Sequence, residues 1–262
     1  MANATAATAT ATWQLDKFSA GFRTRYLSGS GDLLYPEHGI GAIRVDDSVL
    51  EDARLLGLSI PAVSSDTAGS QLEAYTRCGD LVGIYAPTDR HPFRSQVYWR
   101  LSSYTPPEAP SGALASLELV ASKQTDLLES RPDLTVTSEF PCSQVLRLRD
   151  ADSEFELIDC SKPITLSTQD GTGCFLFRLR GDKFSYAEMV YPLDFETTEL
   201  NAVDRSNGKI HRIQHHLFHH RLEKGVILRA RVLGLLLRRE DDLQTTAAHY
   251  ALFAVSDPPL TT

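Results

Sequence analysis

The stretch Cys174-Phe-Leu-Phe-Arg-Leu-Arg180 decides the fold class of this 262-residue chain. Apolar and cationic side chains alternate in it, and a period of two is typical of a β-strand with one buried face. The next residues, Arg180-Gly-Asp-Lys183, resemble a hairpin turn into a second strand over 184–190. The stretch therefore predicts a hairpin within an antiparallel sheet.

The same alternation occurs at residues 144–149 and 154–157, upstream of this hairpin. The side chains predicted to be buried are Leu146, Leu148, Phe155, Leu157, Phe175, Phe177 and Leu179. Those predicted to face solvent or a polar groove are Arg147, Arg149, Arg178 and Arg180. A slip of one residue would exchange the two faces, so both sets are predicted together.

Short runs rich in β-branched and aromatic residues recur along the rest of the chain, separated by turn residues. They predict strands at Phe22–Ser28, Ile40–Asp46, Gln71–Arg77, Leu81–Ala86, Ser95–Ser102, Leu114–Ser122, Leu134–Phe140 and His249–Val255. No helical period persists for three turns over the first 200 residues, so helix is expected to be a minor element.

Residues Leu222–Arg239 fit either a helix or a long strand. Gly225 and Gly234 each weaken a helix by about 1 kcal/mol relative to alanine. Alternation of Arg229 and Arg231 with apolar residues favours the strand.

So many strands must curl or split into two packed layers. We expect an all-β fold, a large two-layer antiparallel β-sandwich of the supersandwich kind with few short helices. No Pro-rich or Ser-rich linker divides the chain, so residues 13–262 are expected to form a single domain. Residues 1–12, rich in Ala and Thr, are interpreted as a disordered N-terminal tail.

Composition excludes several classes of function. The formal net charge of −8, with 26 Lys and Arg against 34 Asp and Glu, argues against binding nucleic acid. The most apolar segment, Val226–Leu237, is too short and too charged to cross a bilayer. The N-terminus has neither the cationic start nor the aliphatic run of a secretory signal, so a cytoplasmic location is expected.

The four cysteines contain no Cys-x-x-Cys pair, so a structural zinc site is not expected. Their flanks are typical of buried or half-buried thiols in a reducing compartment. A disulfide between Cys160 and Cys174 remains open at this level. We expect no metal and no cofactor.

The glycine-rich stretch Ser28–Gly41 has two interpretations. It lacks the Gly-Lys-Ser/Thr ending of a P-loop and the following helix of a dinucleotide-binding motif. It is either a long loop between two strands or a loop that contacts a ligand at one edge of the sandwich. Asp32, Tyr35 and His38 are its candidate ligand-binding side chains.

Five histidines occur between His211 and His220, and neutral imidazole is a common metal ligand. The segment has no His-Glu-x-x-His motif, however, and no carboxylate until Glu223. A solvated strand end or loop of biased composition is the favoured interpretation, with adventitious metal binding as the alternative.

Arginine and aromatic side chains gather between Arg90 and Arg100, and sugar pockets combine such groups for stacking and planar hydrogen bonds. Tyr98 and Trp99 lie on opposite faces of one predicted strand, so only one of them can line a given pocket. We expect any ligand site where the 28–41 stretch meets this strand. Its predicted residues are Asp32, Tyr35, His38, Arg94, Tyr98 and Trp99.

Four stretches resemble a family of uncharacterised proteins from planctomycete bacteria. They are Gly29-Ser-Gly-Asp-Leu-Leu-Tyr-Pro-Glu-His-Gly-Ile-Gly41, Leu117-Glu-Leu-Val-Ala-Ser-Lys-Gln-Thr-Asp-Leu-Leu-Glu-Ser130, Leu222-Glu-Lys-Gly-Val-Ile227 and Pro258-Pro-Leu-Thr-Thr262. Length and strand number are also similar to the galactose-mutarotase-like supersandwich, which is common among proteins that act on carbohydrates. The flanks of the mutarotase His acid and Glu base are absent, so the resemblance assigns no catalytic residue.

Three classes of function follow as hypotheses. The leading one is a carbohydrate-related ligand-binding β-sandwich whose ligand is a sugar or another small polar molecule. The alternative is a sugar-acting enzyme, mutarotase-like, epimerase-like or lyase-like. Its acid would be His38 or His91, and its base Glu37 or Glu73. The third is a non-catalytic structural or assembly protein.

Overall fold

The computed structural model describes residues 12–102, 112–150, 154–181, 183–218 and 220–257. Strands dominate this part of the chain, and every strand pair in it is antiparallel. The predicted tail lies outside the described residues except for Thr12, which begins the first strand. The prediction of a single domain over 13–262 stays a prediction.

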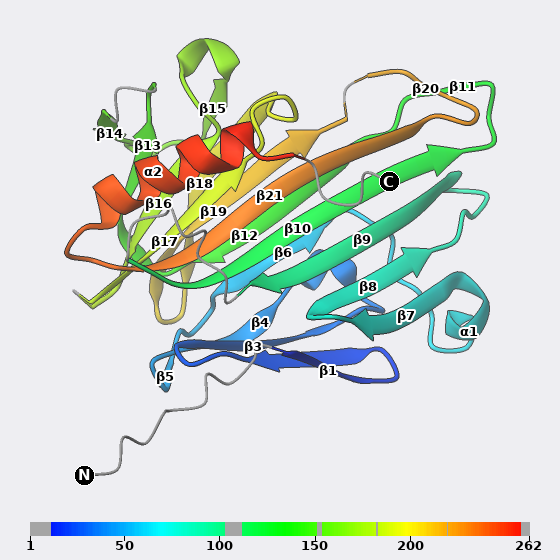
Figure 1. Ribbon diagram of the computed structural model, residues 1–262, viewed down its shortest axis with the longest axis horizontal. Coiled ribbons are helices and arrows are strands. Elements are labelled where there is room, and N and C mark those ends of the chain that lie inside the picture. The colour runs from blue at the N-terminus through cyan, green and yellow to red at the C-terminus, as the bar shows by residue number, and fades with distance from the viewer. Residues whose placement is uncertain (1–11, 103–111, 151–153, 182, 219, 258–262) are drawn as a thin grey trace.

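A nine-stranded sheet runs through the whole molecule (Figure 1). Its strands, in spatial order, are β14 (Phe155–Leu157), β13 (Cys142–Leu148), β16 (Cys174–Leu179), β17 (Phe184–Val190), β21 (Ile227–Arg238), β10 (Ala113–Thr125), β9 (Phe93–Ser102), β8 (Asp80–Tyr85) and β7 (Leu72–Arg77). The hairpin of β16 and β17 confirms one prediction from the sequence. The favoured strand over 222–239 is confirmed for Ile227–Arg238, while a turn at 224–226 separates this strand from residues 222–223.

Two five-stranded sheets and a short strand pair complete the β structure. One sheet has the order β15 (Ile164–Ser167), β18 (Thr197–Arg205), β19 (Gly208–Leu217), β12 (Leu134–Phe140) and β6 (Arg54–Leu58). The other consists of β1 (Thr12–Asp16), β2 (Ser19–Arg23), β3 (Leu27–Asp32), β4 (Gly41–Val45) and β5 (Ser48–Val49). The short pair is β11 (Glu129–Ser130) with β20 (Leu222–Glu223).

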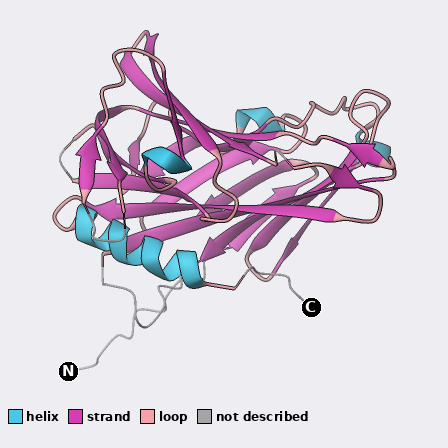
Figure 2. Ribbon diagram, turned by 90° about the horizontal axis from the view of Figure 1, so that it is seen from above, coloured by secondary structure: helices cyan, strands magenta, loops and turns pink. Residues whose placement is uncertain are grey.

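Helices are few in the described residues. They are α1 (Ala68–Gln71), α2 (Asp242–Val255) and the 3₁₀ turns η1 (Pro36–His38) and η2 (Thr168–Asp170). Figure 2 shows the strands in layers, with the long helix α2 along one side. No helix in the described ranges combines the length and the apolar character needed to span a membrane. The expected mainly-β sandwich with few helices is confirmed.

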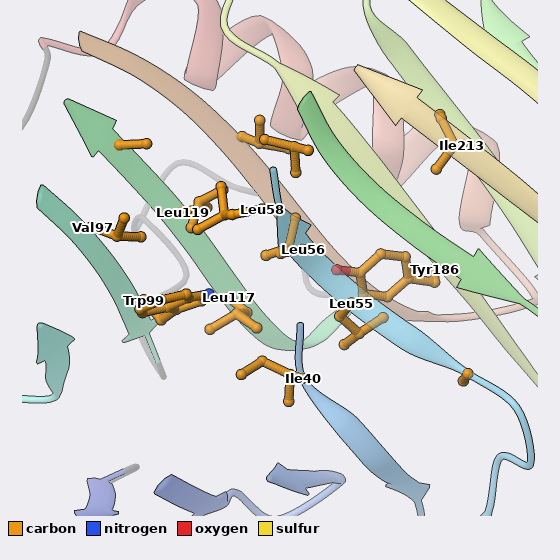
Figure 3. Packing of buried hydrophobic residues seen from close by; sticks show 14 of the residues in the cluster. Ile40, Leu55, Leu56, Leu58, Val97, Trp99, Leu117, Leu119, Tyr186 and Ile213 are labelled. Carbon is orange, nitrogen blue, oxygen red and sulfur yellow. The ribbon is translucent and has the colours of Figure 1, made fainter. Parts of the chain in front are cut away.

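The main core lies between the nine-stranded sheet and the other two sheets. Figure 3 shows Leu56 and Leu58 of β6 facing Leu117 and Leu119 of β10, with Trp99 of β9 beside them. All five side chains are buried. Removal of this apolar surface from water is the main stabilising contribution to the sandwich.

A second, smaller core lies on the opposite face of the nine-stranded sheet. Phe253 and Ala247 of α2 pack there against side chains such as Leu176 and Leu235. The sheet is therefore buried on both faces beneath α2, and its strands there read as continuous apolar runs rather than as an alternation. Beyond α2 the same face carries polar side chains instead.

The strand predicted at His249–Val255 is wrong, because these residues form the second half of α2. Leu243, Ala247, Tyr250 and Phe253 recur at helical spacing and face the smaller core. The stretch also contains aromatic and β-branched residues, which favour a strand when they are considered over only seven positions. The predicted strand Phe22–Ser28 is likewise divided between β2 and β3 by a turn at Thr24.

The predicted buried set is partly wrong. Leu146, Leu148, Phe175, Phe177 and Leu179 are buried, but Phe155 is half-buried and Leu157 is 64% exposed. The cause is that β14 is a three-residue edge strand with only β13 as its neighbour.

Arg147 contradicts its predicted exposure, because its side chain is fully buried in the main core. Its Nε donates to the Thr172 carbonyl at 2.8 Å and its Nη2 to the Ser167 carbonyl at 2.8 Å. These bonds compensate for much of the lost hydration of the guanidinium. Arg149 and Arg180 are exposed and Arg178 is partly exposed, in accord with the prediction.

Candidate functional site

The uncovered part of the nine-stranded sheet presents a polar face. On β9, Val97 and Trp99 point into the main core. The alternate residues Arg94, Gln96, Tyr98 and Arg100 therefore lie on the opposite, outer face. Gln96 Nε2 donates to the Tyr98 hydroxyl at 2.8 Å, and burial together with nearby Tyr75 raises the pKa of Tyr98.

Four charged side chains form a ladder across this face, one from each of β8, β9, β10 and β21. Arg100 Nε lies 3.2 Å from Asp80 Oδ1, and Arg100 Nη1 lies 3.4 Å from Glu118 Oε2. Glu118 Oε1 also accepts from Arg231 Nε at 2.8 Å. Signs alternate along the ladder, so each charge is held by its neighbours in a fixed position.

Arg231 anchors the end of the ladder beneath α2. Its guanidinium lies 4.6 Å from the ring centre of Phe253 and 5.1 Å from that of Tyr191. Its Nη2 donates to Ser256 Oγ at 3.1 Å. Its backbone N–H donates to Asp194, whose pKa burial nonetheless raises to about 6.

A pocket of about 320 Å³ opens between this ladder and α2. We call it the sheet-face pocket, and it is lined by all four ladder residues, Leu233, Leu235, Phe253, His249 and Cys78, among others. Burial lowers the pKa of His249, so its imidazole is neutral near pH 7. Its buried Nε2 has no hydrogen-bond partner among the described residues. The pocket thus offers an apolar wall, a fixed row of charges and one neutral imidazole.

A second pocket of about 520 Å³, the N-terminal pocket, lies where β3, η1 and β4 meet β12 and β18. Its charged and titratable lining residues are Asp32, His38, Asp52, Arg54, Glu139 and Arg205. It contains no aromatic carbocycle, and apolar side chains contribute little to its wall.

The structure separates the six predicted site residues into three places. Asp32 and His38 line the N-terminal pocket, and Tyr35 stacks on His38 with ring centres 5.4 Å apart. Arg94 and Tyr98 are on the outer face of β9, the face of the sheet-face pocket. Trp99 is buried in the main core beside residues 31–33 and 39–40. The 28–41 stretch therefore meets β9, but at the apolar inner face of this strand.

Three histidines of the histidine-rich segment, His211, His215 and His216, lie in strand β19 (Gly208–Leu217), whereas His220 lies beyond its end and is exposed, as expected, and His219 lies outside the described residues. His215 is fully buried, and its Nε2 lies 3.2 Å from Oε1 of Glu188, which is also fully buried. The Thr198 hydroxyl lies 2.7 Å from His215 Nδ1. Among the described residues, no three potential ligand side chains are arranged to hold a metal ion.

Of the acid–base candidates proposed from the sequence, His38 and Glu37 form only an exposed surface pair. His38 Nε2 and Glu37 Oε1 are 3.9 Å apart, and both side chains are exposed to solvent. Burial and the nearby Lys123 ammonium lower the pKa of His91 to about 4, so it is not a proton donor near neutral pH.

Of the ladder residues and His249, only Arg100 lies in the strand region singled out from the sequence, and Asp80, Glu118, Arg231 and His249 were not identified. The signal that could have indicated them is the alternation Ser116, Glu118, Val120 and Ser122 along one face of β10, opposite Arg229 and Arg231. Finding it requires the pairing of strands that lie more than 100 residues apart.

Comparison with known proteins gives likeness in structure but not in sequence. No protein-family model matches the chain, and no curated protein matches it. The planctomycete resemblance therefore stays a prediction.

Two crystal structures resemble it over most of their length. A "Putative aldose 1-epimerase" from Escherichia coli K12 has 9% identity and a TM-score of 0.56, covering 87% of this chain and 99% of that one. A second protein so described, from Klebsiella pneumoniae subsp. pneumoniae MGH 78578, has 10% identity and a TM-score of 0.51, covering 93% and 87%. At these identities the likeness shows the fold alone. The chain therefore has the galactose-mutarotase-like β-sandwich fold of these two proteins.

Proposed function

We propose that the protein binds a neutral mono- or oligosaccharide in the sheet-face pocket. The observation that carries this proposal is the ladder of Asp80, Arg100, Glu118 and Arg231 along the pocket wall. Its carboxylates accept hydrogen bonds from hydroxyl groups and its guanidinium groups donate to them. The ladder is balanced in charge, so it suits a ligand without net charge.

The other wall of the pocket supplies the apolar surface that a sugar ring requires. Small-molecule sites combine an apolar lining with a few fixed polar groups. Phe253, Leu233 and Leu235 provide the apolar lining here. The N-terminal pocket is larger but has no such wall, and we therefore place the ring-binding site on the sheet face.

The two proteins of similar fold support a sugar as the ligand. Both carry the description of an aldose 1-epimerase, an activity on sugars, and both share the sandwich. The support is by analogy of fold. The ladder and the pocket are features of this protein's own structure, and they do not rest on that analogy.

A sugar-acting enzyme is the second candidate, and His249 is the observation that favours it. A neutral imidazole with a buried, unpartnered Nε2 can accept or relay a proton if a bound sugar brings a hydroxyl within reach. Under this alternative, adding the protein accelerates the interconversion of sugar anomers, followed by NMR, and His249→Ala abolishes the acceleration. If the protein only binds sugars, the anomers interconvert at the same rate with and without the protein.

Replacing Arg100 is expected to weaken sugar binding by about tenfold or more, the effect of losing one hydrogen bond to a charged group. Arg100→Ala removes the central donor of the ladder while Glu118 keeps its bond to Arg231. Affinity would be measured calorimetrically for the best sugar from a glycan screen.

Arg149→Ala is the matched control, because Arg149 pairs at 3.6 Å with Glu156 and is 58% exposed, away from the pocket. Its affinity is expected to equal that of the wild type. Equal affinity in Arg100→Ala, or a screen without a single sugar ligand, would contradict the proposal.

A further inference from the structure

The N-terminal pocket contains polar groups that the fold leaves uncommitted. Asp52 and Arg54 make no side-chain hydrogen bond or ion pair within the described part of the chain, yet both line the pocket. His38 adds an exposed imidazole, and Asp32 an exposed carboxylate of which only Oδ1 is used, by the Leu34 N–H. The side chains of Asp52 and Arg54 and one oxygen of Asp32 thus face one hollow without a partner among the described residues.

The pocket wall is held rigidly, because backbone segments cross in direct contact beneath it. A Cβ atom on Gly39 would lie 2.4 Å from the Leu55 carbonyl oxygen, and one on Gly57 would lie 2.5 Å from that of Glu37. Only glycine permits this approach. The contact fixes η1, and with it His38, against β6, which begins at Arg54.

Two residues of the same wall have a strained backbone. Ala42 and Asp52 both line the pocket and both have left-handed backbone conformations, with φ of 49° and 60°. This conformation costs a residue other than glycine about 1–2 kcal/mol, and such strain gathers at functional sites.

The charges on the wall distinguish between classes of ligand. Glu139 is already neutralised, with Oε1 accepting from Arg212 Nε at 2.7 Å and Oε2 lying 3.4 Å from Arg205. An anion would meet the two free carboxylates, and a cation would meet Arg54. Hydroxyl groups can donate to Asp32 and Asp52 and accept from Arg54 at the same time.

We propose that the N-terminal pocket is a second binding site, which takes a neutral polyol, a sugar or a sugar alcohol, through hydroxyl hydrogen bonds to Asp32, Asp52 and Arg54. No aromatic carbocycle lines the pocket, so binding there needs no ring face, and an open-chain polyol suffices. The site is distinct from the sheet-face pocket and does not depend on it.

The test uses the imidazole signals of His38, assigned with His38→Gln, in NMR titrations of the full chain with sorbitol, galactose and inorganic phosphate. Saturable shifts with sorbitol and galactose, but not with phosphate, are expected. Arg54→Gln and Asp52→Asn should each weaken sorbitol binding by about tenfold, the effect of one hydrogen bond to a charged group. Asparagine tolerates the left-handed backbone at position 52, so that variant keeps its fold.

Two controls separate this site from its surroundings. Arg44→Gln removes an exposed arginine of β4 that bonds the Asp47 carbonyl and lies outside the pocket lining, and wild-type affinity is expected. Arg100→Ala should leave the His38 shifts unchanged, even if sheet-face binding fails. Phosphate shifts without polyol shifts, no saturable shift, or unaltered affinity in both pocket variants would overturn the proposal.

Discussion

Glu188→Ala is expected to lower the free energy of unfolding by about 3–5 kcal/mol, the usual cost of removing one partner of a buried charged or strongly polar pair. Glu188 extends from β17 between the two layers, where it is fully buried. Its Oε2 accepts from the Ser138 hydroxyl of β12 at 2.7 Å, and its Oε1 lies 3.2 Å from His215 Nε2 of β19. The change leaves both of those groups in the core without this partner.

Urea denaturation of the wild type and of Glu188→Ala measures the difference in the free energy of unfolding. Glu199→Ala is the matched control, because Glu199 also lies near a histidine of β19, with 3.4 Å between its Oε1 and His216 Nε2, but is 54% exposed. A surface pair of that kind contributes about 0–1 kcal/mol. Equal, small losses of stability in Glu188→Ala and Glu199→Ala would show that the buried contacts of Glu188 with Ser138 and His215 do not join the layers.

Phe177→Ala is expected to cost about 3–5 kcal/mol, the typical loss for truncating a buried phenylalanine. Phe177 is fully buried on the inner face of β16, and its ring centre lies 4.4 Å from that of Phe140 in the opposing layer. Neighbouring strands fix the backbone on both sides, so the cavity cannot collapse freely. Chemical denaturation at equilibrium gives the change.

Leu157→Ala distinguishes the structure from the sequence pattern. The alternation at 154–157 predicts Leu157 in the core, whereas the structure leaves it 64% exposed. A change within about 0.5 kcal/mol is expected for such a surface position. A loss comparable to that of Phe177→Ala would mean that β14 is wrongly placed.

The hairpin of β16 and β17 and the strand β12 could be predicted because each carries its own signal. Their apolar residues alternate or their turns contain glycine, and both properties are local. Leu134–Phe140 is a strand with the bounds expected from the sequence. The division into two layers followed from the number of strands alone.

Arg147 and α2 could not be predicted in the same way, because their environment is set by distant parts of the chain. Arg147 is buried because Ser167 and Thr172, which follow β14 in the chain, supply carbonyl partners for its guanidinium. The helix α2 covers the outer face of β16 and β21, which turns an expected polar face into a second core. Tertiary context of this kind overrides local propensity.

The candidate site was missed for a related reason. Asp80, Arg100, Glu118 and Arg231 are far apart in sequence and become neighbours only through strand pairing. Three of the predicted residues, Asp32, Tyr35 and His38, do lie together, since a single short loop carries them. Local clusters can be recognised from sequence, and cross-strand clusters cannot.

Modification of Cys78 tests the central claim, that a sugar occupies the sheet-face pocket, most directly. Cys78 is exposed and lines this pocket, while the other three cysteines are buried. Burial raises the pKa of Cys142 and Cys174, and that of Cys160 to about 11, so their thiolates are scarce and shielded.

The rate of Cys78 alkylation by iodoacetamide would be measured by mass spectrometry with and without a saturating sugar from the glycan screen. We predict that the sugar slows alkylation severalfold in the wild type, and that Arg100→Ala loses this protection at the same sugar concentration. A sugar that binds the protein yet leaves the alkylation rate of Cys78 unchanged would contradict the account.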